Sequence, residues 1–528
     1  MIIKGCIISG HYFDSVTLMS VAKKISGSPG VIDAAVVMGT KENRSILAGS
    51  GLLLKEFENA TDSDLLFAIK AENNETAENL ISRIDEFLKS TSKKDDEKQE
   101  TSPRSIESAC KFLSGANLAL ISIAGKYAAA EAMKALEQGM HVMIFSDNVS
   151  LEKELELKKY AIERGLMVMG PDCGTAIING TPLAFANVVN RGEIGIVAAS
   201  GTGLQEVSCI ISNSGKGVSQ AIGTGGRDVK KEVGGIMFIE ALKALGDDPN
   251  TKVLVLVSKT PHSEVLKKIS KALNEIKKPK VAVFFGVDAN LEGVHVVKTL
   301  EEAAFTAVNC TENGTAEEVQ ERLRTRRRLI KEAARRGTEK LAPGQKYVRG
   351  LFSGGTFCSE SQVIFKNMYS NMSGNIWSNV PIEAFKKLKN SWQSKEHTLI
   401  DLGEDEFTVG RPHPMIDYSL RNRKIVDEAS DKETAVILLD VVLGYGSNMK
   451  PLKDLLPVLE EAKSIALENG RYLPIVCSIT GTELDPQNRN KVEAGLKEAG
   501  VIVMSSNAEA SEFAGYVATC LGTALGEK

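Results

Sequence analysis

From Asn117 onward the chain alternates short apolar runs with helical stretches, and this rhythm constrains its fold more than any other feature. Apolar runs at Leu118–Ala124, His141–Phe145 and Leu166–Met169 are separated by stretches with helical periodicity. Continuous apolar strands that alternate with helices are typical of parallel sheets covered on both faces. The sequence therefore predicts an α/β protein with doubly wound parallel sheets.

The rhythm recurs in two later parts of the chain, which indicates an internal duplication. Each part contains a small-residue turn, Ser200-Gly201-Thr202-Gly203 in one and Ser353-Gly354-Gly355-Thr356 in the other. A turn of this kind before a helix points several N–H groups at one place, where a phosphate or carboxylate can bind. A helix cap explains a single turn equally well. Because two turns match, we predict that both bind anions.

The polar segment 89–104 is the one stretch with the composition of a linker, and it sets off a small first domain. The remaining boundaries follow from the changes in rhythm. We predict a small α+β domain of ACT or ferredoxin type at 1–88, a linker at 89–104, a Rossmann-like domain at 105–190, a flavodoxin-like domain at 191–320, an Arg-rich connecting helix at 321–345, and a second flavodoxin-like domain at 346–528.

Charge and cysteine content exclude several classes of partner and site. The net charge is −4, with 64 basic and 68 acidic residues, so the chain lacks the positive field that nucleic acids and acidic membranes attract. No leader peptide and no apolar run of about 20 residues is present, which predicts a cytoplasmic protein. The eight cysteines include no CxxC pair, so we expect neither disulfides nor a metal site.

The most suggestive candidate for proton transfer is His413, in a loop made rigid by Pro412 and Pro414. Arg411 lies in the same loop, and Asp417 and Arg421 follow it. Arginines beside a histidine and an aspartate can hold a carboxylate and move a proton. The alternative is a surface turn with an Arg–Asp pair.

Two further candidates lie beside glycine-rich turns. Cys173 follows an apolar strand in Gly170-Pro171-Asp172-Cys173, at a position where doubly wound folds bind ligands. A lone cysteine is more often a packed thiol. Arg227 follows Gly223-Thr224-Gly225-Gly226 and could bind an anion. Neither this segment nor the Ser200 turn fits a phosphate-binding P-loop.

These motifs together resemble a known family. The stretch from Asn117 to Cys310 resembles the α subunit of succinyl-CoA synthetases, through Gly170–Cys173 and Gly195–Thr202. Nearly the full chain resembles FdrA-type proteins, most clearly at Gly170–Thr175, Pro182–Val188 and Val409–Asp417. The resemblance implies a CoA-binding-like domain at 105–190 and two succinyl-CoA-ligase-like domains after it.

The sequence departs from the phosphorylating members of that superfamily. Those ligases carry phosphate on a histidine in Gly-His-Ala-Gly-Ala, which a glutamate on an earlier strand end steadies. The corresponding stretch Phe284–Leu291 has no histidine, and Ser258-Lys259-Thr260-Pro261 replaces the glutamate segment. Acyl-CoA synthesis through a phosphohistidine is therefore not expected.

The resemblance to FdrA proteins also implies a role in anaerobic purine and allantoin breakdown. There the family resembles a component of oxamate carbamoyltransferase, which converts oxalurate and phosphate into oxamate and carbamoyl phosphate together with other operon-encoded subunits. The two turns would bind the anion, Arg411 and Arg421 a second carboxylate, and His413 would carry the proton. The resemblance assigns no cofactor, because phosphate and carbamoyl phosphate are substrates. We also expect the protein to form an oligomer. The alternatives are an NDP-forming acyl-CoA synthetase subunit that binds CoA, and a regulatory subunit whose first domain senses a metabolite.

Overall fold

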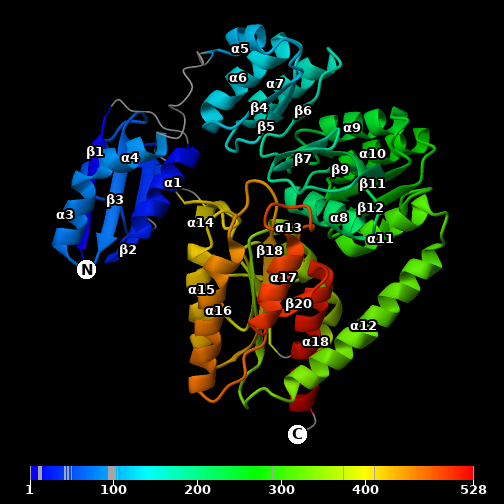
Figure 1. The fold of residues 1–528 in the computed structure, drawn as a ribbon. Helices are drawn as coiled ribbons and strands as arrows, with labels where there is room; N and C mark the ends of the chain where they lie inside the picture. Colours follow the sequence, from blue (N-terminus) through cyan, green and yellow to red (C-terminus); the bar gives the residue numbers. More distant parts are fainter. Residues whose placement is uncertain are drawn as a thin grey trace. The chain divides into compact units, whose positions relative to one another are not determined.

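The computed structural model describes residues 2–9, 15–40, 43–44, 47–48, 50–92, 103, 105–287, 290–372, 374–408 and 411–526. The chain forms two compact units. The first contains Met1–Gly115 and Gly403–Asp417, and the second contains Ala116–Leu402 and Tyr418–Lys528. None of the described helices is long and apolar enough to cross a bilayer. Figure 1 labels the elements of both units.

The first unit is built on a small antiparallel sheet of order β1-β3-β2. Alternate residues of β3 face opposite sides: Leu65, Phe67 and Ile69 belong to one apolar cluster, and Leu66 and Ala68 to another. Both clusters are buried, which confirms the predicted α+β domain. Its main elements are β1 (Ile2–Ile8), α1 (Ser15–Ser26), β2 (Val31–Met38), β3 (Leu65–Ala71), α3 (Asn74–Ser82), α4 (Ile84–Ser92), α5 (Ile106–Phe112) and α14 (Asp405–Thr408). Helix α4 extends into the predicted linker.

The second unit begins with a three-stranded parallel sheet of order β4-β5-β6, so the predicted β-α-β-α-β pattern is confirmed. Its strands are short and its helices are amphipathic, as the sequence rhythm requires. The elements are β4 (Leu118–Ile121), α6 (Gly125–Glu137), β5 (His141–Ile144), α7 (Leu151–Ile162) and β6 (Val168–Met169).

A seven-stranded sheet of order β13-β12-β11-β9-β10-β7-β8 follows. Strands β9 to β13 pair in parallel, whereas β7 pairs antiparallel with both β10 and β8. The hairpin β7–β8 ends before residue 190 but pairs with the following domain, so the boundary predicted there is misplaced. The elements are β7 (Thr175–Ile178), β8 (Thr181–Ala184), β9 (Arg191–Ala198), α8 (Gly201–Asn213), β10 (Val218–Gly223), α9 (Ile236–Asp247), β11 (Val253–Ser258), α10 (Ser263–Glu275), β12 (Lys280–Phe284), β13 (His295–Val297), α11 (Leu300–Thr311) and α12 (Ala316–Thr338).

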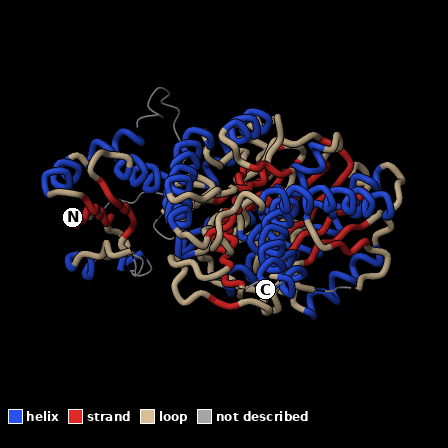
Figure 2. The backbone as a smooth tube through the Cα atoms, turned by 90° about the horizontal axis from the view of Figure 1, so that it is seen from below, coloured by secondary structure: helices blue, strands red, loops and turns tan. Residues whose placement is uncertain are grey.

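A second seven-stranded sheet, of order β16-β15-β17-β14-β18-β19-β20, is parallel throughout. In Figure 2 the strands of the second unit lie among enclosing helices, as expected of doubly wound sheets. The elements are β14 (Tyr347–Phe352), α13 (Gly355–Met368), β15 (Ile376–Ser378), β16 (Lys386–Lys387), β17 (His397–Asp401), α15 (Ser419–Ser430), β18 (Thr434–Val442), α16 (Pro451–Glu468), β19 (Ile475–Thr480), α17 (Arg489–Glu498), β20 (Ile502–Met504) and α18 (Asn507–Gly526).

The long Arg-rich helix α12 connects the two large sheets and contacts α18 (Figure 1). Arg326 and Arg327 both bind the carboxylate of Glu512 in α18, at 2.5 and 3.0 Å. These arginines therefore serve packing between α12 and α18.

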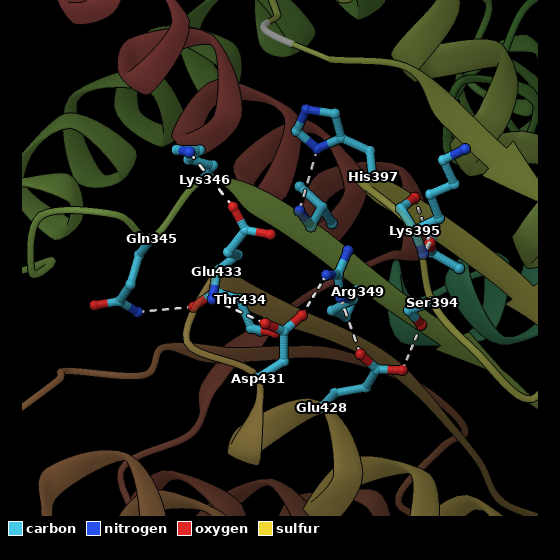
Figure 3. A network of polar contacts seen from close by, with 12 residues as sticks. Gln345, Lys346, Arg349, Ser394, Lys395, His397, Glu428, Asp431, Glu433 and Thr434 are labelled. Atoms are coloured by element: carbon cyan, nitrogen blue, oxygen red, sulfur yellow. Dashed lines mark hydrogen bonds and ion pairs between the residues drawn. The ribbon is translucent and has the colours of Figure 1, made fainter. Parts of the chain in front are cut away.

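A polar network holds the amino end of β14 (Figure 3). Arg349 is 2% exposed, and its guanidinium lies 2.9 Å from Glu428 Oε2 and 2.5 Å from Asp431 Oδ2. On the neighbouring strand, His397 Nδ1 accepts a hydrogen bond of 3.1 Å from the Val348 amide. Buried ion pairs with several partners fix geometry more than they add stability. The network therefore positions the strand whose other end carries the turn at Ser353, one of the two turns predicted to bind anions.

Candidate active site

The two predicted turns meet in the structure. Ser200 follows β9 and caps α8, where its side chain accepts a hydrogen bond from the Gly203 amide. Gly354 follows β14 and caps α13. The Ser200 and Thr356 hydroxyl oxygens are 2.5 Å apart, so the N-termini of the two helices lie side by side. The structure therefore brings two positive helix ends to one place.

The contacts between the helix ends follow a pseudo-twofold relation. Counted from each cap residue, Thr202 and Thr356 occupy the same helical position. Ser200 contacts Thr356, and a methyl group added to Gly354 would lie 2.9 Å from Thr202 Cγ2. Glycine at 354 therefore lets the second helix end approach the first closely.

Four backbone N–H groups remain available at this junction. Among the described residues, the backbone amides of Gly201, Thr202, Gly355 and Thr356 donate no hydrogen bond. The first turn of a helix leaves such donors without intrahelical partners, and an anion is the ligand that they favour. With the hydroxyls of Ser200 and Thr356, the junction is suited to bind a phosphate or carboxylate oxygen.

Asp440 in β18 holds the second turn in place through hydrogen bonds to its carboxylate. Its carboxylate accepts hydrogen bonds from the Ser353 amide at 2.7 Å, the Ser353 hydroxyl at 2.5 Å and the Gly354 amide at 3.2 Å. Burial raises the pKa of Asp440, whereas the charge of Arg421 opposes that rise. Asp440 therefore orients the second turn.

The structure corrects the role predicted for Arg421. The residue is fully buried in α15, and its Nη1 donates to the Asp440 carbonyl oxygen at 2.6 Å. The same nitrogen lies 3.5 Å from Asp440 Oδ1. Its charge compensates a buried carboxylate, so it supports the turn in place of binding a substrate carboxylate.

Two charged residues absent from the predicted site flank the end of α13. A methyl group on Gly355 would lie 2.3 Å from Asp401 Oδ2 and 3.3 Å from Lys259 Nζ. Asp401 ends β17 and Lys259 follows β11, so both come from carboxyl strand ends. In the sequence, both residues are marked only by their position after an apolar run. The order of the strands in the sheets decides which strand ends lie close together.

The His413 loop belongs to the first compact unit, whereas the helix junction belongs to the second. His413 Nδ1 accepts a hydrogen bond from the Met415 amide at 3.2 Å, and burial lowers the pKa of the imidazole to about 4. It is therefore neutral at pH 7. Arg411 lies 3.3 Å from Asp33 in β2, and the Asp417 amide donates to the His413 carbonyl. Val409 and Gly410 of this loop lie outside the described residues. The catalytic roles of His413 and Asp417 stay predictions.

Cys173 and Arg227 have structural roles in place of the predicted ones. Cys173 is 2% exposed, and burial raises the pKa of its thiol to about 12, so it stays protonated at neutral pH. Arg227 is partly exposed, and its Nη2 lies 2.9 Å from Oε2 of the buried Glu154, which Lys158 also binds together with Asp228. Arg227 thus stabilises the packing of α7.

The chain is similar in sequence to known proteins. Over 510 residues, the chain is 41% identical to the protein YahF of Escherichia coli (strain K12), covering 96% of this chain and 97% of that one. The chain belongs to the YahF family. Within this YahF-family protein, residues 351–517 match the family described as CoA-ligase, and residues 1–104 match the one described as AllF, heavy metal-associated domain. Among the described residues no cluster of three His, Cys, Asp or Glu side chains could hold a metal ion.

Partial matches link the YahF-family protein to ligase subunits. It is 29% identical to the mitochondrial succinate–CoA ligase [ADP-forming] subunit alpha-2 of Trichomonas vaginalis, over 33% of this chain and 58% of that subunit. It is 31% identical to the ADP-forming sulfoacetate-CoA ligase subunit SqwL of an Acholeplasma species, over 29% and 53% of the two chains. These matches, with that to the CoA-ligase family, show that the chain contains a scaffold like that of the succinate–CoA ligase alpha subunit.

Proposed function

We propose that this chain is a subunit of a carbamoyltransferase that converts oxalurate and phosphate into oxamate and carbamoyl phosphate. The observation that carries the proposal is the junction of two helix ends, where four free N–H groups and two hydroxyls surround one place. A reaction between two anions needs such a surface, because the donors offset the repulsion between the reactants.

The proposed step needs no phosphorylated residue. An oxygen of phosphate attacks the carbamoyl carbon of oxalurate, and the bond from that carbon to the inner ureido nitrogen breaks. The nitrogen takes the proton of the phosphate and leaves as the amide of oxamate, so atoms and charges balance. N–H groups at the helix ends stabilise the charge that develops on the carbamoyl oxygen. The absence of a histidine from the sequence Phe284–Leu291 supports this route.

The second candidate is an NDP-forming acyl-CoA synthetase subunit, which the CoA-ligase match over 351–517 favours. That family implies coenzyme A, and parallel sheets hold nucleotides at the turn after a strand such as β4. At this turn, a methyl group on Gly125 would lie 2.0 Å from the Asp147 carbonyl oxygen. That glycine therefore serves close backbone packing, and it forms no cradle for a pyrophosphate. The residues described there do not fit the coenzyme, so we derive no step through it.

The test combines this chain with its operon-encoded neighbours and measures carbamoyl phosphate formed from oxalurate and phosphate. Thr356→Val keeps the shape of the side chain but removes a hydroxyl from the junction, and we expect turnover to fall about tenfold or more. Thr338→Val, at the end of α12, is the matched control and should leave turnover unchanged. His413→Ala tests the predicted proton carrier.

Two results would contradict the proposal. One is full turnover by the neighbours without this chain, which would favour a regulatory subunit. The other is acyl-CoA formation from CoA and ATP without any carbamoyl phosphate, which would favour the ligase.

A further inference from the structure

Lys259 brings a cation from the first seven-stranded sheet to the helix end that follows β14 in the second. Strands β9 and β11 pair in parallel with Val257 opposite Ala198, so Lys259 leaves β11 at the level where Ser200 leaves β9. From there its ammonium reaches the first residue of α13, 3.3 Å from the position of a methyl group on Gly355. The lysine thus lies beside the available amides.

This ammonium has no carboxylate partner. No carboxylate of the described residues lies within 4.0 Å of Lys259 Nζ, although the Asp401 carboxylate flanks the same glycine. Lys259 is exposed, whereas Asp401 is 2% exposed. An unpaired ammonium beside four free N–H groups is a concentration of positive charge that a multiply charged oxyanion neutralises best.

We propose that Lys259 binds the phosphate group of the substrate and that Asp401 accepts a hydrogen bond from the carbamoyl amino group. This inference rests on the proposed function and names the residues that would set its specificity. The ammonium and the amides of Gly355 and Thr356 hold the phosphate oxygens. The Asp401 carboxylate, which lies beside the same glycine, would then accept from the group attached to the phosphate.

The opposite charges give the site a way to distinguish carbamoyl from acyl groups. Carbamoyl phosphate carries an NH2 group that can donate to a carboxylate, whereas acetyl phosphate has a methyl group at that place. A carboxylate has about four acceptor positions, so Asp401 can accept this bond in addition to its present contacts. A methyl group would leave the buried carboxylate without the added donor, which costs binding free energy.

The test measures binding of phosphate, carbamoyl phosphate and acetyl phosphate to the full chain by calorimetry. We expect Lys259→Met to weaken all three by roughly 10- to 100-fold, as loss of a hydrogen bond to a charged group predicts, and Lys259→Arg to restore most of the affinity. Lys252→Met is the matched control, because Lys252 is an exposed lysine just before the other end of β11. Asp401→Asn should leave phosphate binding within about threefold, and should reduce the preference for carbamoyl over acetyl phosphate.

The outcomes separate this inference from the function on which it rests. If Lys259→Met binds phosphate as tightly as Lys252→Met does, the role of Lys259 is wrong, whatever the turnover assay shows. If Asp401→Asn keeps the full preference for carbamoyl phosphate, the role of Asp401 is wrong. If the binding results hold but no carbamoyl phosphate forms with the neighbouring subunits, the anion site stands and the proposed reaction fails.

Discussion

Glu360 links three helices and should make the stability of the second unit depend on pH. The residue lies in α13 and is fully buried; its Oε1 accepts from the Leu300 amide and its Oε2 from the Asn507 side chain, both at 2.7 Å. Burial raises the pKa of Glu360 from 4.5 to about 7, against the effect of these two hydrogen bonds. Glu206, also buried, raises it further.

The sign follows from proton uptake. Between pH 4.5 and about 7 the folded protein holds a proton on Glu360 that the unfolded chain has released, so the free energy of unfolding falls as pH rises through this range. A shift of this size corresponds to roughly 3 kcal/mol at about 1.4 kcal/mol per unit. The stabilising contribution is fully present below pH 4.5 and is lost above pH 7.

Glu360→Gln removes the titration and keeps most of the shape. We expect its free energy of unfolding, minus that of the wild type, to rise by roughly 3 kcal/mol between pH 5 and pH 8. In addition, we expect the free energy of unfolding of the variant to be lowered by a constant amount of about 1 kcal/mol at every pH, because the glutamine side chain offers one acceptor to two donors. Urea unfolding followed by tryptophan fluorescence suits this measurement, because Trp377 and Trp392 are the two tryptophans of the chain and both lie in the second unit.

The control is Glu498→Gln, which changes an exposed glutamate at the end of α17. Its difference from the wild type should stay within about 0.5 kcal/mol at every pH. A flat difference for Glu360→Gln across the same range would refute the reasoning, since it would mean that the buried carboxylate titrates as in the unfolded chain.

Three further predictions concern packing. Gly223→Ala should lower the free energy of unfolding by about 2 kcal/mol or more in thermal melts, because its methyl group would lie 2.3 Å from a backbone carbonyl oxygen and 2.7 Å from Cys173 Sγ; an unchanged melting temperature would contradict it. Cys173→Ala should cost about 1 kcal/mol of stability and leave turnover intact, since the buried thiol stays protonated; loss of turnover in folded protein would restore its catalytic role. Lys158→Met should cost about 3–5 kcal/mol in urea unfolding, because it leaves the buried carboxylates of Glu154 and Asp228 without their shared cation; a loss below 1 kcal/mol would show that they are not charged.

The local features of the fold could be predicted from the sequence. Strand and helix periods are properties of neighbouring residues, so the parallel sheets and the turns at Ser200 and Ser353 were visible in the sequence. The hairpin β7–β8 was missed because its strands are four residues long and their sheet partner lies far along the chain.

Only the tertiary structure decided which of these features act together. Lys259, Asp401 and Asp440 are separated by long stretches of sequence, and they meet at the helix junction because strand order and register bring those strand ends together. Burial likewise decided that Arg421 compensates a buried aspartate, although its sequence context near His413 suggested that it binds a substrate carboxylate. Sequence patterns report which side chains are available, whereas long-range packing sets their neighbours and their charge.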